Sequence, residues 1–219
     1  MDGNSHHRAI LFDFDGTLID ASDAIVSAFN LTLRDLGIAE MEHKSVVRLI
    51  GRPLQEMFFE VMGRRPQAEE VESILDIYRE HFYPIATSHA RPLPGLAETL
   101  TYYSGRIKLG IATSRHSRGA YQILEHFGLR SHFGAVVGLD HVNQAKPHPE
   151  PLLQALRQLE TEPAQAVMVG DTTDDMAAAR AARVLAVGIT TGSHSRRELK
   201  AAGAHHIITS LPALRSIVA

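Results

Sequence analysis

The chain has 219 residues, of which 44% are hydrophobic, and its formal net charge at pH 7 is -3. This length and apolar content allow a sizeable core, either one large domain or a domain with a smaller accessory one, and exclude general disorder. The charge balance offers no basic footprint for nucleic acid or anionic lipid, and the lack of cysteine excludes disulfides, thiolate metal sites and a cysteine nucleophile.

Residues 1–8 lack the apolar region of a signal peptide. No later run approaches the ~18 apolar residues that a membrane span needs. We therefore expect a cytoplasmic protein with no nucleic-acid or membrane partner and with a small molecule as its ligand.

The run Ala-Ile-Leu-Phe at 9–12 is typical of a buried parallel strand, and Gly16-Thr17 predicts the turn that follows it. Asp13 and Asp15 lie between them, two positions apart. We expect both side chains on one face beyond the carboxyl end of the strand, where open α/β sheets bind ligands. Two like charges so close require a cation or a shared proton. Mg²⁺ suits them, because it takes carboxylate and carbonyl oxygens and keeps waters that a phosphate can replace.

In residues 20–83 apolar residues recur every three or four positions, and this spacing predicts helices only. The pattern breaks at Gly51-Arg52-Pro53 and then resumes with the same period. A backbone break with an arginine can reach a substrate carboxylate or a second phosphate, so Arg52 is a candidate substrate contact. The alternative is a solvated arginine in a turn between helices.

From Pro92 onward, strand-like runs alternate with helical patterns, which indicates βαβ units and a parallel sheet with helices on both faces. The predicted strands are 108–112, 135–137, 166–169, 185–187 and 206–208, and the predicted helices include 119–127, 149–159 and 174–183. The first strand must join this sheet. We therefore expect a doubly wound, Rossmann-like α/β core formed by 1–19 and 90–219. A helical cap at 20–89, too long for an ordinary loop, interrupts it.

Three further polar motifs follow predicted strands, where they can converge on the first two aspartates. Thr113 and Ser114 place hydroxyls after an apolar strand, and a hydroxyl donates to a phosphoryl oxygen without adding charge. Capping of the next helix is the alternative for them. Lys146 is one of four lysines in the chain and can neutralise a phosphoryl group and an attacking carboxylate together. Its alternative is a solvated loop lysine.

The third motif ends a buried strand with acidic residues. Asp171 follows the strand directly, as a metal ligand should, and Asp175 lies one helical turn later. Asp174 and Asp175 can instead complement the positive N-terminus of the following helix. Of these residues, Asp171 is the surer metal ligand.

In order along the chain, DFDGT at 13–17, Thr113, Lys146 and GDTTDD at 170–175 resemble the four signatures of the haloacid dehalogenase-like hydrolase superfamily. The resemblance covers nearly the whole chain. From Gly192 onward the tail resembles that of phosphoglycolate phosphatase-like members. Helical caps of this superfamily lie between the first and second signatures, which matches the long spacing between those two here.

The resemblance implies a Mg²⁺-dependent phosphatase for a small phosphomonoester, either phosphoglycolate-like or a sugar phosphate. Asp13 would attack phosphorus to give an aspartyl-phosphate, while Asp15 first protonates the leaving alcohol and then activates the hydrolytic water. Asp13, the main-chain carbonyl of Asp15 and Asp171 would ligate the metal, with Asp175 supporting them. Asp15 also favours phosphoryl transfer, since the superfamily's dehalogenases lack an aspartate there. Substrate or phosphate binding is assigned to Gly16, Thr113, Ser114, Lys146 and Arg52.

Other functions stay open at this point. A sugar-phosphate mutase would need an acid-base histidine in the cap, and residues 21–25 contain none. A phosphonate hydrolase acting through a Schiff base would need a cap lysine, for which Lys44 is the sole candidate. A phosphoacceptor receiver domain is much shorter and has its phosphorylated aspartate on the third strand. A non-catalytic phosphate-binding or regulatory protein is a further alternative, and the oligomeric state is either monomer or homodimer.

Overall fold

The computed structural model of the chain describes residues 7–218. Residues 1–6, on which part of the signal-peptide argument rests, lie outside the described residues. In the described part, no helix combines the length and the apolar character that crossing a bilayer requires.

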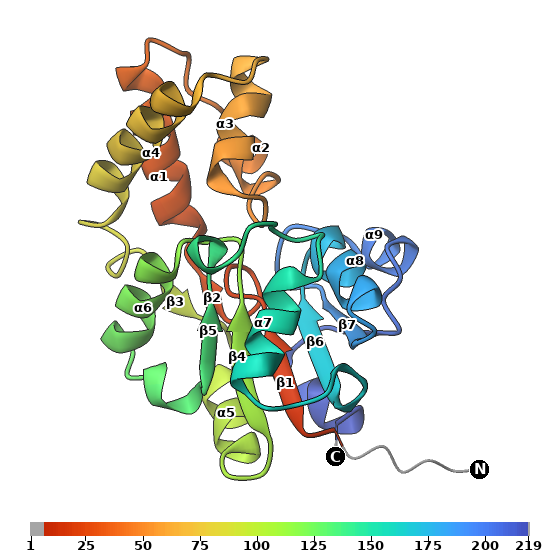
Figure 1. Cartoon of the computed structure of the whole chain (residues 1–219). Helices are drawn as coiled ribbons and strands as arrows, with labels where there is room; N and C mark the ends of the chain where they lie inside the picture. The colour runs from red at the N-terminus through yellow and green to blue at the C-terminus, as the bar shows by residue number, and fades with distance from the viewer. Residues whose placement is uncertain (1–6, 219) are drawn as a thin grey trace.

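A parallel sheet of six strands forms the centre of the molecule, in the order β5-β4-β1-β6-β7-β8 (Figure 1). Its strands are β1 (Ala9–Phe12), β4 (Lys108–Ala112), β5 (Ala135–Val137), β6 (Ala166–Gly170), β7 (Leu185–Ile189) and β8 (His206–Ile208). The six predicted strands are therefore confirmed, with β6 and β7 slightly longer than expected. The first strand lies in the middle, paired with β4 on one side and β6 on the other, and it is buried throughout.

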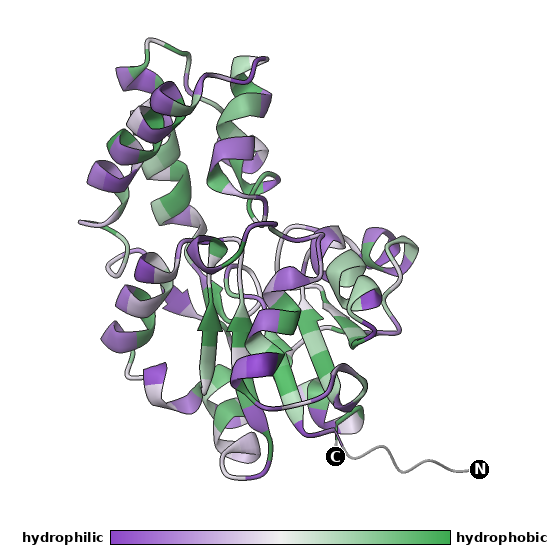
Figure 2. Cartoon of the chain, in the orientation of Figure 1, coloured by the Kyte–Doolittle hydropathy of each residue, from purple (hydrophilic) through white to green (hydrophobic). Residues whose placement is uncertain are grey.

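Helices cover both faces of the sheet (Figure 1). One face packs on α5 (Leu96–Tyr103), α6 (Ser117–His126) and the 3₁₀ helix η4 (Leu211–Ser216), and the other packs on α7 (Glu150–Gln158), α8 (Thr173–Ala181) and α9 (Arg196–Ala201). Ile10 and Phe12 of β1 belong to the first core, whereas Ala9 and Leu11 belong to the second. Short 3₁₀ turns η1, η2 and η3 cover Arg130–His132, Leu139–His141 and Pro163–Gln165. This two-faced burial explains why the strands are mainly apolar (Figure 2), apart from the exposed Lys108 and His206 at the first positions of β4 and β8.

Four helices form a separate layer beyond the carboxyl ends of the strands (Figure 1). They are α1 (Ser22–Asp35), α2 (His43–Val47), α3 (Leu54–Met62) and α4 (Ala68–Phe82), called the helical insertion below. Aromatic rings contribute to its core: Phe29 stacks on Phe58 at 4.4 Å between centroids, and Phe58 meets Tyr78 edge to face at 6.2 Å. We propose that residues 20–89 form a cap domain on the core formed by 1–19 and 90–219.

A short ribbon and two helices of the core were not expected from the sequence, nor were the 3₁₀ turns. A two-stranded antiparallel ribbon, β2 (Ile19–Asp20) with β3 (Arg91–Pro92), joins the helical insertion to the core, and strands of two residues are too short to show alternation. Helix α5 follows a left-handed Gly95 and is also short. Helix α9 begins with a capping box of Ser195 and Glu198, a pattern that the sequence does display.

Candidate active site

The ends of three neighbouring strands and the loop after η2 bring four polar side chains together. Asp13 follows β1, Thr113 follows β4 and Asp171 follows β6, while Lys146 comes from the loop. All four are at most 3% exposed. The strand order explains this meeting, since β4 and β6 are the two neighbours of β1, and the sequence reasoning expected these residues at one edge of the sheet.

Lys146 links two of the buried carboxylates. Its Nζ donates to Asp13 Oδ1 at 2.7 Å, to Asp175 Oδ1 at 2.6 Å and to the carbonyl of Ala112 at 3.0 Å. Burial alone would lower the pKa of this amine, but the two carboxylates outweigh it and hold the pKa of Lys146 above its ordinary value. The lysine is therefore a fixed buried cation and not the solvated loop residue considered above.

Asp13, Asp171 and Asp175 form an acidic cluster in which one oxygen from each lies within 4.8 Å of the others. Burial, reinforced by Asp175, raises the pKa of Asp171 to about 7, and burial raises that of Asp13 as well. The Oδ2 atom of Asp13 is buried and has no hydrogen-bond partner among the described residues. An orphaned carboxylate oxygen beside two other carboxylates is what a hard divalent cation would satisfy, so these residues fit Mg²⁺.

The chain closes tightly around the carboxylate of Asp171. Thr17 Oγ1 donates to its Oδ1 at 2.8 Å and the Ser193 amide donates to its Oδ2 at 3.0 Å. A Cβ at Gly192 would lie 1.9 Å from Oδ2, and one at Gly16, where φ is 78°, would lie 2.7 Å from it. Both positions therefore need glycine, and Gly16 acts here by shaping the surroundings of Asp171.

Replacing Asp171 with asparagine should stabilise the metal-free protein and remove its stabilisation by Mg²⁺. The folded pKa of about 7 lies above the unfolded value near 3.8, so the folded state holds a proton between these pH values and the free energy of unfolding falls as pH rises through that window. With EDTA present, we expect Asp171→Asn to raise the free energy of unfolding at pH 8 by on the order of 4 kcal/mol and to change it little at pH 4.

Urea titrations at the two pH values, repeated with excess Mg²⁺, measure this effect. Mg²⁺ should stabilise the wild type but not the variant. Equal stabilisation of both proteins by Mg²⁺, or full Mg²⁺-dependent turnover by the variant, would remove Asp171 from the metal site.

Asp15 lies apart from this cluster. The strand ends at Phe12, so Asp15 belongs to the turn, and its carboxylate forms a buried ion pair with Arg115. In the structure Lys146 pairs with Asp13 and Arg115 pairs with Asp15, while both aspartates line one cavity. The cation or proton that the two aspartates were expected to share stays a prediction. The metal contact assigned to the Asp15 main-chain carbonyl stays a prediction.

The two hydroxyls after β4 differ in what they contact. Thr113 Oγ1 accepts a hydrogen bond from the Arg115 amide at 3.1 Å, whereas the N-cap of the next helix, α6, is His116, so Thr113 does not cap that helix. Ser114 Oγ is buried and has no partner among the described residues. Ser114 therefore has a hydroxyl available to a ligand, and Thr113 keeps an O–H that can donate.

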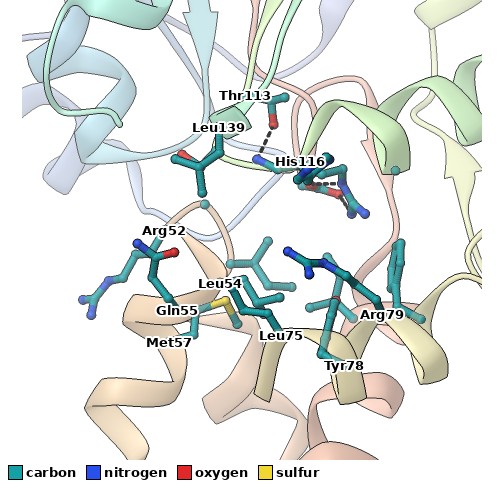
Figure 3. A pocket seen from close by; sticks show the side chains of 18 of the residues that line it. Arg52, Leu54, Gln55, Met57, Leu75, Tyr78, Arg79, Thr113, His116 and Leu139 are labelled. Atoms are coloured by element: carbon teal, nitrogen blue, oxygen red, sulfur yellow. Dashed lines mark hydrogen bonds and ion pairs between the residues drawn. The ribbon is translucent and has the colours of Figure 1, made fainter. Parts of the chain in front are cut away.

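A cavity of about 120 Å³ separates these residues from the helical insertion (Figure 3). The side chains from the insertion are mostly apolar, and Leu54, Met57 and Leu75 are among them. Arg79 also comes from the insertion and points into the cavity, while its Nη1 donates to Asp76 Oδ1 at 2.6 Å. The sequence reasoning missed Arg79, although it lies next to Tyr78 on the buried stripe of α4.

Arg52 lies at the edge of the same cavity and points away from the core (Figure 3). Its guanidinium pairs with Glu60, and 48% of its side chain is exposed. The preceding residue, Gly51, has φ of 105°, and a Cβ there would lie 2.5 Å from Thr172 Cγ2, so this turn rests on the core. In this arrangement Arg52 contacts the surface of the insertion, and its predicted substrate contact would need a different side-chain orientation.

Comparison with known proteins agrees with this geometry. The family described as haloacid dehalogenase-like hydrolase matches residues 10–189. A phosphoglycolate phosphatase of Aquifex aeolicus is 32% identical over 80% of this chain and 81% of its own. The pyrophosphatase PpaX of Halalkalibacterium halodurans is 30% identical over 96% of both. The crystal structure of a predicted phosphatase from Clostridium acetobutylicum superposes with a TM-score of 0.88 at 29% identity, covering 97% of this chain and 98% of that one.

Proposed function

Because the chain belongs to the haloacid dehalogenase-like hydrolase family, as a phosphatase, we propose that it hydrolyses a small organic phosphomonoester through an aspartyl-phosphate. The relatives do not agree on one substrate, since one is named for phosphoglycolate and another for pyrophosphate. A cavity of about 120 Å³ suits a small leaving group, either phosphoglycolate-like or a sugar.

The proposed reaction has two steps. In the first, a carboxylate oxygen of Asp13 attacks phosphorus and the bond from phosphorus to the ester oxygen breaks. Asp15, which enters this step as the carboxylic acid, gives its proton to the leaving alcohol. In the second, a water oxygen attacks the aspartyl-phosphate, a water proton passes to the Asp15 carboxylate, and the bond between Asp13 and phosphorus breaks. Phosphate leaves, and both aspartates return to their starting states.

The strongest single support is the set of contacts around Asp13. One of its oxygens is held by Lys146 at 2.7 Å, and the other has no partner among the described residues. The first contact orients the carboxylate and places a cation beside the position where phosphoryl charge would gather. The second leaves an oxygen available for attack or for a metal. Ser114 supplies a free hydroxyl at the same edge.

We propose Mg²⁺ as the cofactor, held by Asp13, Asp171 and the main-chain carbonyl of Asp15, with Asp175 supporting them. When bound, the ion supplies Lewis-acid stabilisation of the phosphoryl oxygens. Asp175 is well suited to support, because its Oδ2 accepts from the amide and hydroxyl of Thr172 while its Oδ1 accepts from Lys146. Those contacts fix the carboxylate next to Asp13 and Asp171.

The alternative chemistries receive less support. Lys44, the one lysine in the helical insertion, is 82% exposed on its side chain and pairs with Glu42 at 2.9 Å, so no Schiff-base amine faces the cavity from there. A regulatory protein without catalysis has no need of an unpartnered buried carboxylate oxygen. Hydrolysis of a phosphomonoester is therefore the function that we propose.

Phosphate release by the wild type tests this proposal. We expect 2-phosphoglycolate, small sugar phosphates or p-nitrophenyl phosphate to be hydrolysed with Mg²⁺, and EDTA to reduce the rate at least about 100-fold because the acidic cluster loses its charge compensation. Excess Mg²⁺ should restore the rate. Ca²⁺ should restore much less, since it prefers more ligands at longer distances.

Inorganic pyrophosphate and a phosphonate complete the substrate panel, and boiled enzyme is the blank. Turnover that is indifferent to EDTA would contradict the metal proposal alone. Release from no ester, combined with turnover of the phosphonate, would contradict the phosphomonoesterase proposal.

A further inference from the structure

Arg115 forms a buried ion pair that the two-step reaction does not by itself require. Its Nη2 donates to Asp15 Oδ1 at 2.6 Å and its Nε donates to Asp15 Oδ2 at 2.9 Å. Only 10% of the arginine side chain and 11% of the aspartate side chain are exposed. Both oxygens of the proposed acid-base carboxylate are thus bound by one planar group.

The same guanidinium is packed between aromatic rings of the core and of the helical insertion. Its Cζ lies 4.7 Å from the ring centroid of Phe82 and 5.7 Å from that of Phe14. Phe82 is the last residue of α4, and Phe14 lies between the two catalytic aspartates. Arg115 is therefore in contact with the turn that holds Asp15 and with a helix of the insertion.

Helix α6 borders this packing without constraining it. A Cβ on Gly119 would lie 3.4 Å from Arg115 Nη1 and 3.6 Å from Phe82 Cε1, which is ordinary van der Waals contact. The guanidinium is therefore held by its contacts with Asp15 and with the two rings.

We propose that Arg115 is the positioning residue of the acid-base step: it fixes the orientation of the Asp15 carboxylate and, through Phe82, ties that orientation to the helical insertion. The carboxylate lies in a turn and has two rotatable side-chain torsions, so without a bidentate partner its plane is not defined. This inference rests on the proposed function, because it assumes that Asp15 transfers the proton to the leaving alcohol.

The quality of the leaving group distinguishes this role from a general contribution to folding or phosphate binding. When the ester oxygen leaves as an alkoxide it needs the proton from Asp15, whereas p-nitrophenolate departs without one. The value of kcat/KM reports all steps up to departure of the alcohol. A misoriented Asp15 should therefore reduce kcat/KM for alkyl esters and leave that for the aryl ester nearly unchanged.

The experiment compares Arg115→Met with wild type on 2-phosphoglycolate or the best alkyl ester of the panel and on p-nitrophenyl phosphate, both with Mg²⁺. We expect kcat/KM for the alkyl ester to fall about 30-fold, part of the 10²–10⁴-fold that general acid catalysis provides, and that for the aryl ester to fall less than about 3-fold. Arg115→Lys keeps a cation but cannot donate to both carboxylate oxygens at once. Its kcat/KM for the alkyl ester should therefore lie between those of Arg115→Met and wild type. Phe82→Leu should show the same selectivity with a smaller loss.

Arg118→Met is the matched control. Arg118 lies on the same helix, and its Cζ lies 4.5 Å from the ring of Tyr83, another aromatic residue of the same region, but it makes no contact with Asp15 among the described residues. For this variant we expect the ratio of kcat/KM for the alkyl ester to kcat/KM for the aryl ester to equal that of the wild type. If Arg115→Met does not fold, Arg115→Lys gives the same comparison.

Equal loss on both esters, or no loss on either, would overturn the positioning role of Arg115. Failure of the proposed function itself looks different, since wild type would then release phosphate from neither ester. Asp15→Asn provides the reference for complete loss of the acid, and an unchanged alkyl-to-aryl ratio in that variant would show that Asp15 is not the acid.

Discussion

Asp13→Asn is expected to reduce phosphate release at least about 10³-fold on every substrate, because the amide that replaces the carboxylate cannot act as the nucleophile. The substitution hardly changes the volume of the side chain. Its amide oxygen can still accept from Lys146, whose Nζ now lies 2.7 Å from Oδ1. The fold should therefore survive, and the loss should appear in kcat and not in the melting temperature.

The covalent intermediate gives a second measurement of the same substitution. In wild type, quenching with acid during turnover and digesting the protein should yield a peptide that includes Asp13 and carries one phosphoryl group. That peptide should be absent in Asp13→Asn. Asp23→Asn is the control, since Asp23 is an exposed aspartate of α1 whose side chain pairs with His43. Full turnover by Asp13→Asn, or a phosphoryl group on another residue, would remove Asp13 from the nucleophile position.

The core of the fold was predictable because its rules are local and periodic. Each strand of a doubly wound sheet is buried on both faces, so it appears in the sequence as a short apolar run, and the helices between the strands show their own period. The place of β1 in the middle of the sheet brought Asp13, Asp171 and Thr113 to one edge, as the sequence reasoning expected. The ribbon of β2 and β3 was not predictable, since two residues display no period.

The site was predictable in its residues but only partly in its contacts. A strand followed by Asp13 and a lone Lys146 before a proline indicate which groups meet, because strand ends share one edge of a sheet. Which cation pairs with which carboxylate depends on side-chain packing that spacing does not determine. The bidentate contact of Arg115 with Asp15 and the outward orientation of Arg52 both depend on such packing, so the sequence did not predict them.

The lysine at the centre of the site also determines stability. Lys146→Met keeps the aliphatic volume but leaves Asp13 and Asp175 buried without their shared cation. Removing one partner of a buried ion pair costs about 3–5 kcal/mol, because the remaining charge is then uncompensated. We expect the free energy of unfolding of the metal-free variant to fall by about that amount at pH 8, and kcat to fall by at least about 10²-fold.

The loss of stability should depend on pH and on metal. Burial raises the pKa of Asp13, and the charge of Lys146 opposes that rise, so without Lys146 this pKa lies further above the unfolded value. The folded variant then takes up a proton as pH falls, and its deficit relative to wild type should shrink between pH 8 and pH 5. Mg²⁺ should stabilise the variant more than wild type, since a cation near Asp13 and Asp175 then replaces the missing charge. Urea titrations at both pH values, with EDTA and with Mg²⁺, measure both effects.

Lys44→Met is the matched control. That lysine is 82% exposed, so its replacement should change the free energy of unfolding by no more than about 0.5 kcal/mol. A Lys146→Met protein as stable as wild type in EDTA at pH 8 would mean that the acidic cluster is already protonated there, and the buried cation would then have no structural role.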